Sequence, residues 1–206
     1  METRIIKIDS WELTSAKNLF ENFSSLKSFE GDLSSLTNGE CMFYRCSALT
    51  SFVSDLRYLT YGNHMFRDCS CLSEFTSDLR YLDDARFMFY NCYDLIEFNS
   101  DLSSLDDGYG MFYNCNKLTT FECNNLSSLT NGYNMFYNCY NLIAFNSDLN
   151  SLTDGTQMFR NCSTLETFNS NLSSLTDGNY MFRACTSLTS FNSDFGGSTR
   201  ADGTKK

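Results

Sequence analysis

The amino-acid sequence predicts an α/β-type repeat solenoid, in which short units stack so that their strands form one parallel β-sheet. The dipeptide Met-Phe recurs every 23 residues from Met42 to Met181, with a single step of 24 between Met111 and Met135. Leu, Phe and Cys recur at the same step, so every unit has the same apolar face, which only stacked neighbours can bury. About nine units account for residues 3–195, so we expect one solenoid over 1–195 and a flexible tail over 196–206.

Each unit opens with a predicted strand of the pattern Leu-x-x-Phe-x-Ser-Asp. Alternation along a strand places Phe and Ser inward and the residues between them outward. The inward Phe recurs from Phe29 to Phe191, and the Leu that opens the strand recurs from Leu26 to Leu188. Since neighbouring strands lie ~4.8 Å apart, the sheet should be roughly 40 Å long. The extra residue near Phe121 predicts a bulge or a wider turn in that unit.

An acidic residue follows most of the strands. The column comprises Asp9, Asp32, Asp55, Asp78, Asp101, Asp148 and Asp194, with Asn125 and Asn171 in the other two units. Asp and Asn side chains accept hydrogen bonds from nearby backbone N–H groups, so we expect this column to cap the turns. The alternative is a ladder of carboxylates that binds calcium or a basic partner.

The second half of each unit returns the chain to the next strand. Its pattern, Met-Phe-x-x-Cys-x-x-Leu, spaces apolar residues three apart and predicts a short helical or 3₁₀ segment. The turn before it reads Leu-Thr-Asp-Gly in several units. Ala16 and Ala85 occupy the Gly position of that turn elsewhere, so we expect tight packing there rather than a positive φ.

Ten cysteines could form a disulfide framework, but seven of them occupy one core column, from Cys46 to Cys185. Free Cys behaves as a small buried apolar residue, so we expect reduced thiols in that column. Disulfides between stacked units remain a geometric alternative. Cys123 falls in the inward Ser column, while Cys41 and Cys71 occupy variable outward positions and are the expected reactive thiols.

Composition excludes several classes of function. The 206 residues include 25 acidic and 15 basic residues, for a formal charge of −10, which argues against nucleic acid as a partner. No apolar run approaches the ~18–20 residues of a membrane span, and the start lacks the features of a signal peptide. His64 is the single histidine, and the cysteines lie too far apart for a zinc site. We therefore expect no enzyme, catalytic residue, cofactor or metal.

The segment Phe89–Phe98 reads F-x-x-C-x-x-L-x-x-F. This pattern, repeated over about nine-tenths of the chain, resembles the BspA-like, treponemal-type leucine-rich repeat family of bacterial and protist surface proteins. The resemblance implies a curved solenoid with its parallel sheet on the concave face, which would place the predicted returns on the convex face. It also implies adhesion or recognition rather than catalysis, and an extracellular surface or virion-associated location. The inward Ser and the following Asp depart from the family pattern of Ile or Leu and Pro, so partner identity does not carry over.

Two groups of residues are candidate binding residues. The first should lie on the exposed sheet face and suits polar partners such as glycans or a basic protein; it includes Glu30, Glu74, Glu97, Asn99, Glu122, Asn146 and Asn169. The alternative is a sheet that is merely solvated. The second group is Arg57-Tyr58 and Arg80-Tyr81, where four other units have Ser-Ser. Arg and Tyr are frequent at binding hot spots, so adjacent identical departures indicate a local patch.

The predicted function is therefore a non-enzymatic interaction or adhesion module that binds a protein or glycan ligand. Neither end of the solenoid shows a capping segment, and exposed sheet edges favour pairing. The alternative function is a structural component of a larger assembly, such as a virion or surface array, which self-associates through its terminal strands.

Overall fold

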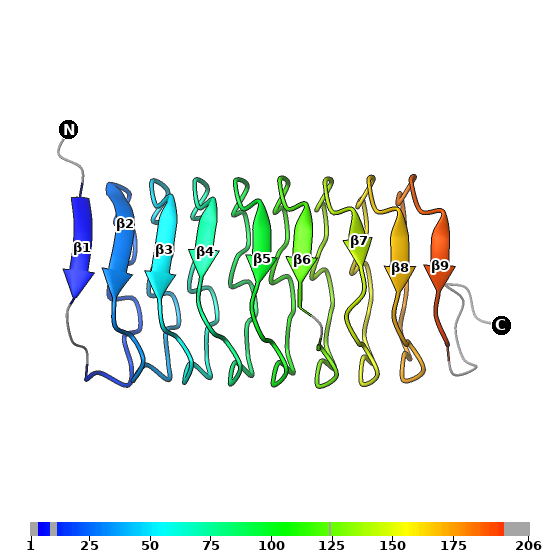
Figure 1. The fold of residues 1–206 in the computed structure, drawn as a ribbon, viewed down its shortest axis with the longest axis horizontal. Coiled ribbons are helices and arrows are strands. Elements are labelled where there is room, and N and C mark those ends of the chain that lie inside the picture. Colours follow the sequence, from blue (N-terminus) through cyan, green and yellow to red (C-terminus); the bar gives the residue numbers. More distant parts are fainter. Residues whose placement is uncertain (1–3, 9–11, 124, 196–206) are drawn as a thin grey trace.

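The computed structural model describes residues 4–8, 12–123 and 125–195. They form a solenoid whose strands all run in the same direction and follow one another in sequence order, with the termini at opposite ends (Figure 1). The strands of the described residues are β1 (Arg4–Ile8), β2 (Leu26–Gly31), β3 (Ser51–Ser54), β4 (Glu74–Thr76), β5 (Glu97–Asn99), β6 (Thr120–Glu122), β7 (Ala144–Phe145), β8 (Thr167–Asn169) and β9 (Ser190–Asn192).

The strands pair in parallel, and each inward Phe lies beside the Phe of the next unit. Phe29 pairs with Phe52, for example, and Phe52 pairs with Phe75. Hydrogen-bonded pairing joins neighbouring strands from β1 through β4, then β5 with β6, and then neighbouring strands from β7 through β9. The break between β6 and β7 falls in the unit with the extra residue; residue 124, part of the predicted bulge, lies outside the described residues. The predicted parallel strands are confirmed, but their pairing forms three sheets among the described residues, so the predicted single sheet is not confirmed.

The return segments are turns, and the described residues contain no helix. In the second unit the amide of Met42 donates to the carbonyl of Gly39, and that of Cys46 donates to Phe43. The amides of Cys41 and Phe43 instead donate to carbonyls of the next unit. The prediction of helical or 3₁₀ returns was wrong because a left-handed residue interrupts each return twice, as at Cys41 (φ 55°) and Arg45 (φ 60°).

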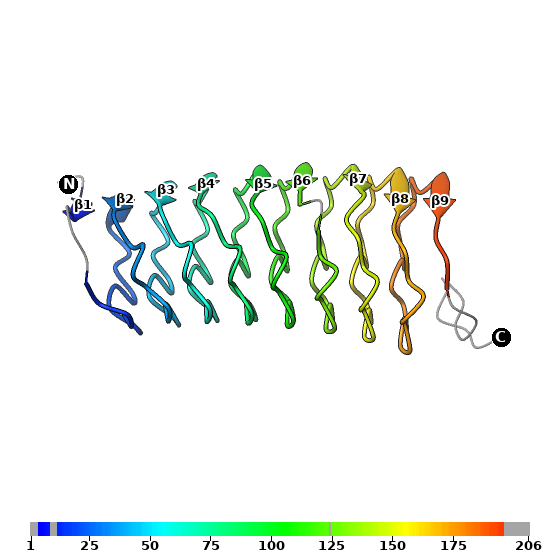
Figure 2. The same ribbon diagram turned by 60° about the horizontal axis from the view of Figure 1, so that its bottom comes forward.

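This second set of hydrogen bonds also sets the shape of the solenoid. A helical return, about 10–12 Å wide, would spread the units apart on the return side and curve the stack around the sheet. Here both sides are joined by hydrogen bonds from unit to unit, so both repeat at the ~4.8 Å spacing of strands. The units stack in a nearly straight row in both views, so the predicted concave sheet face was wrong (Figure 2).

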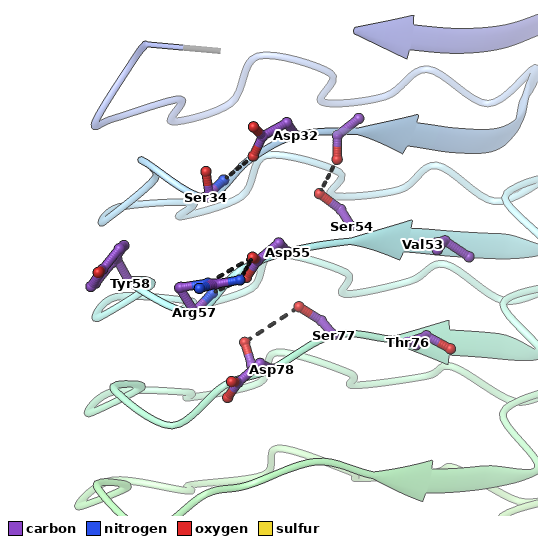
Figure 3. A pocket seen from close by; sticks show the side chains of 11 residues that line it. Asp32, Ser34, Val53, Ser54, Asp55, Arg57, Tyr58, Thr76, Ser77 and Asp78 are labelled. Atoms are coloured by element: carbon purple, nitrogen blue, oxygen red, sulfur yellow. Dashed lines mark hydrogen bonds and ion pairs between the residues drawn. The ribbon is translucent and has the colours of Figure 1, made fainter. Parts of the chain in front are cut away.

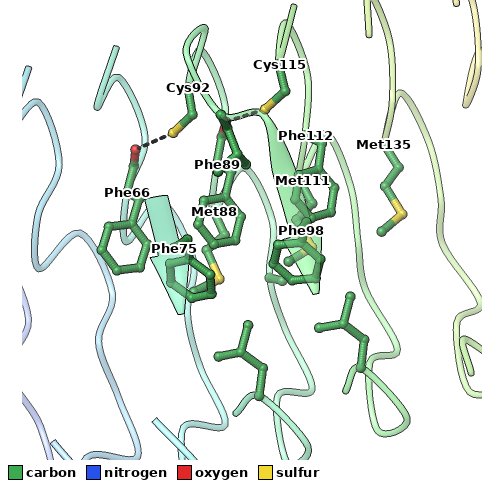
Figure 4. Packing of buried hydrophobic residues seen from close by; sticks show 14 of the residues in the cluster. Phe66, Phe75, Met88, Phe89, Cys92, Phe98, Met111, Phe112, Cys115 and Met135 are labelled. Atoms are coloured by element: carbon green, nitrogen blue, oxygen red, sulfur yellow. Dashed lines mark hydrogen bonds between the residues drawn. The ribbon is translucent and has the colours of Figure 1, made fainter. Parts of the chain in front are cut away.

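The core is a pair of aromatic stacks with the cysteine column beside them (Figure 4). Phe89 stacks on Phe66 with ring centroids 5.4 Å apart and meets Phe75 edge-on at 4.8 Å. The thiol of Cys92 donates to the carbonyl oxygen of Phe66 at 3.2 Å. The structure has all ten cysteines as free thiols. The predicted core position of the column is confirmed from Cys46 to Cys162, and Cys185 is half-buried. Burial raises the pKa of the Cys46 thiol to about 12.

The predicted tight packing at the Gly position is also confirmed. Gly132 has no positive φ, and a Cβ there would lie 2.9 Å from the sulfur of Met158.

At the two ends of the described solenoid the same columns are exposed. Leu13, one unit before buried Leu36, is 54% exposed, and Phe23, one unit before buried Cys46, is 40% exposed. The expectation that every unit buries the same apolar face was therefore wrong at the first turn. Phe191, in the last strand, is 38% exposed. The Met-Phe unit occurs seven times, and the predicted count of nine whole units is not confirmed.

The predicted tail, 196–206, lies outside the described residues. Among the residues that are described, no helix has the length and apolarity that crossing a bilayer requires.

Candidate recognition surface

The outward side chains of the strands form two columns along the exposed sheet face. In one column Glu30 pairs with Val53, Asn99 with Glu122, and Asn169 with Asn192. The side-chain NH₂ group of Asn192 donates to the side-chain oxygen of Asn169 at 3.0 Å, so part of the asparagine row is hydrogen-bonded from unit to unit. The predicted sheet-face residues are all exposed: Glu30, Glu74, Glu97, Asn99, Glu122, Asn146 and Asn169.

The middle of this face is acidic. Glu74 and Glu97 begin β4 and β5 in the second column, and Glu122 ends β6 in the first. Within the described part of the chain, none of these three carboxylates forms an ion pair. They leave an uncompensated negative strip across neighbouring strands.

The Asp column caps the turns that follow β2 to β8. An oxygen of Asp55 accepts the backbone N–H of Arg57 at 3.0 Å, and Asp78 accepts that of Arg80 at 3.0 Å. The same bond occurs at Asp32, Asp101, Asn125, Asp148 and Asn171. The predicted capping role is confirmed at these positions, while Asp9 lies outside the described residues. No group of three or more His, Cys, Asp or Glu side chains that could hold a metal ion occurs among the residues described.

The two Arg-Tyr departures lie side by side on neighbouring turns, and all four side chains are exposed. Arg57 Nε donates to the second oxygen of Asp55 at 2.7 Å (Figure 3). Arg80 Nε donates to Asp78 in the same way at 2.7 Å. Hydrogen bonds from these guanidinium groups hold the pKa of both carboxyls below the usual value. The rings of Tyr58 and Tyr81 stack in parallel, with centroids 5.9 Å apart and planes 8° apart.

Two open hollows meet at Tyr58. The first has a volume of about 830 Å³ and crosses the turns after β2, β3 and β4, where Asp32, Asp55 and Asp78 follow the strands (Figure 3). The second, of about 610 Å³, is lined by Ser35, Thr37, Tyr58, Thr60 and Tyr81. A third hollow of about 380 Å³, further along the solenoid, includes Asn99 and Glu122 in its lining.

Two ladders of side chains run from unit to unit along the return side. The side-chain NH₂ group of Asn114 donates to the side-chain oxygen of Asn91 at 2.8 Å, and that of Asn138 donates to the side-chain oxygen of Asn114 at 2.8 Å. The recurring dipeptide Asn-Cys was a signal for this ladder. Beside it, Tyr113 stacks on Tyr90 at 4.7 Å and on Tyr137 at 4.6 Å. These ring faces cover one another, so the tyrosine row mainly stabilises the returns.

The fold defines a parallel β-solenoid built from leucine-rich units. A family model described as "BspA type Leucine rich repeat region (6 copies)" matches residues 6–108 and 85–196. The chain therefore belongs to the BspA-type leucine-rich repeat family, as the resemblance predicted.

Solved structures with similar folds include a leucine rich cell surface protein from Faecalibacterium prausnitzii A2-165. It is 21% identical, with a TM-score of 0.48, and the match covers 91% of this chain and 59% of that chain. A leucine-rich repeat protein from Bacteroides ovatus ATCC 8483 is 15% identical, with a TM-score of 0.46, over 92% of this chain and 69% of that one. This chain thus spans about three-fifths of the first protein's length. No curated protein matches the sequence significantly.

Proposed function

We propose that this protein is a non-enzymatic recognition module, and that its ligand contacts the exposed sheet face and the turns that follow the strands. One observation carries the proposal. The core columns hardly vary from unit to unit, whereas Arg57-Tyr58 and Arg80-Tyr81 depart from the usual Ser-Ser on two neighbouring, exposed turns. Exposed Arg and Tyr beside hollows have the composition of a binding hot spot. The family supports interaction rather than catalysis.

The location and ligand class belong to the same proposal. We place the module on an extracellular surface, where a protein or glycan is the ligand. The acidic strip of Glu74, Glu97 and Glu122 and the asparagine row of Asn146 and Asn169 form the outer part of the contact surface, together with Glu30 and Asn99.

A binding screen with a Ser-restored variant tests this function. The full chain is screened against immobilised extracellular proteins and glycans, and the variant replaces Arg57, Tyr58, Arg80 and Tyr81 by Ser. Because four other units carry Ser-Ser at these turns, the variant should fold normally. We expect binding to be lost in the variant, and adding Ser173→Arg with Ser174→Tyr at a distant turn should not restore it. Ligands bound equally well by the variant would refute the proposed patch.

A second candidate function is assembly through the ends. Leu13, Leu19 and Phe23 are exposed at one end and Phe191 at the other. In the part of each return around the Met-Phe pair, the N–H groups that leave the unit donate toward the C-terminal neighbour, as Cys41 does to Asn63 and Phe43 does to Met65. Two copies would therefore join head to tail, and such contacts form open filaments. Light scattering over rising concentration should then show growing mass in the full chain, whereas a constant monomer mass would refute assembly.

A further inference from the structure

Tyr58 combines an open ring face with polar neighbours. One face of its ring is stacked on Tyr81 in the next unit. The corresponding position of the preceding unit is Ser35, whose small side chain leaves the other face open to the hollow of about 610 Å³. Tyr81, Thr37 and Thr60 complete the lining of that hollow, and the two threonines carry methyl groups. The site therefore offers a flat aromatic surface with room beside it.

The turn just before Tyr58 offers hydrogen-bond donors and acceptors together. Asp55 binds a backbone N–H with one oxygen and Arg57 Nε with the other, and each oxygen retains accepting capacity toward solvent. The side chain of Arg57 is 54% exposed, so N–H groups that do not face Asp55 remain available to a ligand. The same couple recurs one unit along, at Asp78 and Arg80.

Paired charges of this kind select against several ligand classes. An anion would have to compete with Asp55 for Arg57, and it would also meet Asp32, whose turn carries Ser34 in place of Arg. A cation would have to compete with the guanidinium for the same carboxylate. An apolar partner would remove two ion pairs from water without replacing their hydrogen bonds, which is costly.

A hydroxyl group, in contrast, can use both members of such a couple, because it both donates and accepts hydrogen bonds. Neighbouring hydroxyls on a sugar ring match a carboxylate and a guanidinium that lie side by side. The C–H face of the same ring is apolar and slightly positive, and it suits the negative face of an aromatic ring. We propose that Tyr58 and the couples Asp55–Arg57 and Asp78–Arg80 bind a neutral sugar residue of a glycan. This inference rests on the proposed recognition function and names its ligand class.

The test uses the full chain with an array of neutral and sialylated glycans, followed by saturation-transfer NMR and calorimetry on neutral glycans that bind. Tyr58→Ser should weaken binding at least tenfold, because it removes the stacking surface yet restores the Ser of most units. Tyr58→Phe keeps the ring and should bind within about threefold of the original affinity.

Asp55→Asn separates ligand binding from folding. Asn caps this turn naturally at Asn125 and Asn171, so the turn should persist, while the oxygen that holds Arg57 becomes an NH₂ group. We expect at least a tenfold loss of neutral-glycan affinity. Asp101→Asn makes the same change in a turn that carries Ser-Ser and should leave affinity unchanged.

Three outcomes would overturn the inference. Binding of sialylated but not neutral glycans would show that the ligand is an anion. Binding of a protein that Tyr58→Ser abolishes, without any glycan binding, would refute the sugar and leave the recognition function standing. If no protein or glycan in either screen depends on Arg57, Tyr58, Arg80 and Tyr81, both the sugar and the proposed recognition patch are refuted.

Discussion

Replacing Phe89 by alanine tests whether the aromatic stacks hold the units together. Phe89 is fully buried, with Phe66 and Phe112 stacked on its two faces at 5.4 Å. Phe75 and Phe98 meet it edge-on at 4.8 and 5.7 Å. Truncation of a buried Phe costs about 3–5 kcal/mol, and aromatic pairs contribute about 0.5–1.5 kcal/mol each beyond their buried area. With four such pairs, we expect a loss near the upper end, about 4–5 kcal/mol.

Urea unfolding followed by circular dichroism measures this loss. Phe23→Ala is the matched control, because Phe23 is 40% exposed at the first turn and, among the described residues, meets one aromatic ring, that of Phe20, at 5.9 Å. It should cost no more than about 1–2 kcal/mol, in proportion to its smaller burial. Because stability in repeat proteins depends on contacts between neighbours, Phe89→Ala should also broaden the transition. Equal losses for the two variants would refute the argument that stacking between units stabilises the solenoid.

Three further predictions concern thiols, pH and the asparagine ladder. Native protein should label rapidly at exposed Cys71 and slowly at buried Cys92, whose pKa is raised by burial; rapid labelling of seven or more thiols would contradict this. Asp55 has a folded pKa lowered by its bond to Arg57, so its contribution to stability is complete above the unfolded pKa near ~3.9 and is lost as pH falls through the lower folded value. When the pH is lowered from about 5 to about 2, the urea midpoint of unfolding should therefore fall less in the Asp55→Asn variant than in the original chain. An equal fall in both would argue against this linkage. Asn114→Gly keeps the left-handed backbone but loses two ladder bonds, so it should cost about 1–3 kcal/mol in urea unfolding, whereas no change would show that the ladder adds nothing to stability.

Repetition made much of the fold predictable. Aligned units turned single residues into columns, so the inward positions of Phe89 and Cys92 followed from period alone. The capping role of Asp55 was predictable because it depends only on the two residues that follow it. The curvature of the solenoid was not predictable, since apolar residues spaced three apart fit both a helix and a series of turns. The left-handed backbone at Asn91 and Asn114 distinguishes them, and it was visible only as a recurring Asn.

The candidate site was predictable in part for a different reason. Arg57 and Tyr58 stood out because they broke the repeat, and exposed positions followed from alternation along the strand. The hollow beside Tyr58 could not be predicted, because it depends on a large residue in one unit and on Ser35 in the preceding unit. The repeat also misled at Leu13, where the column continues in sequence although no described unit covers it on one side. Translational symmetry predicts the middle of a solenoid better than its ends.

The backbone hydrogen bonds that join neighbouring units, one set through the strands and one through the returns, have a mechanical consequence. A force that separates the ends of the row acts along these bonds, and it loads the outermost unit before the next. Each unit released frees 23 residues, which extend to roughly 75–80 Å, whereas the stacked unit occupied ~4.8 Å. The molecule should therefore lengthen in nearly equal steps under tension, with one longer step at the 24-residue unit, and act as an extensible tether instead of a rigid post.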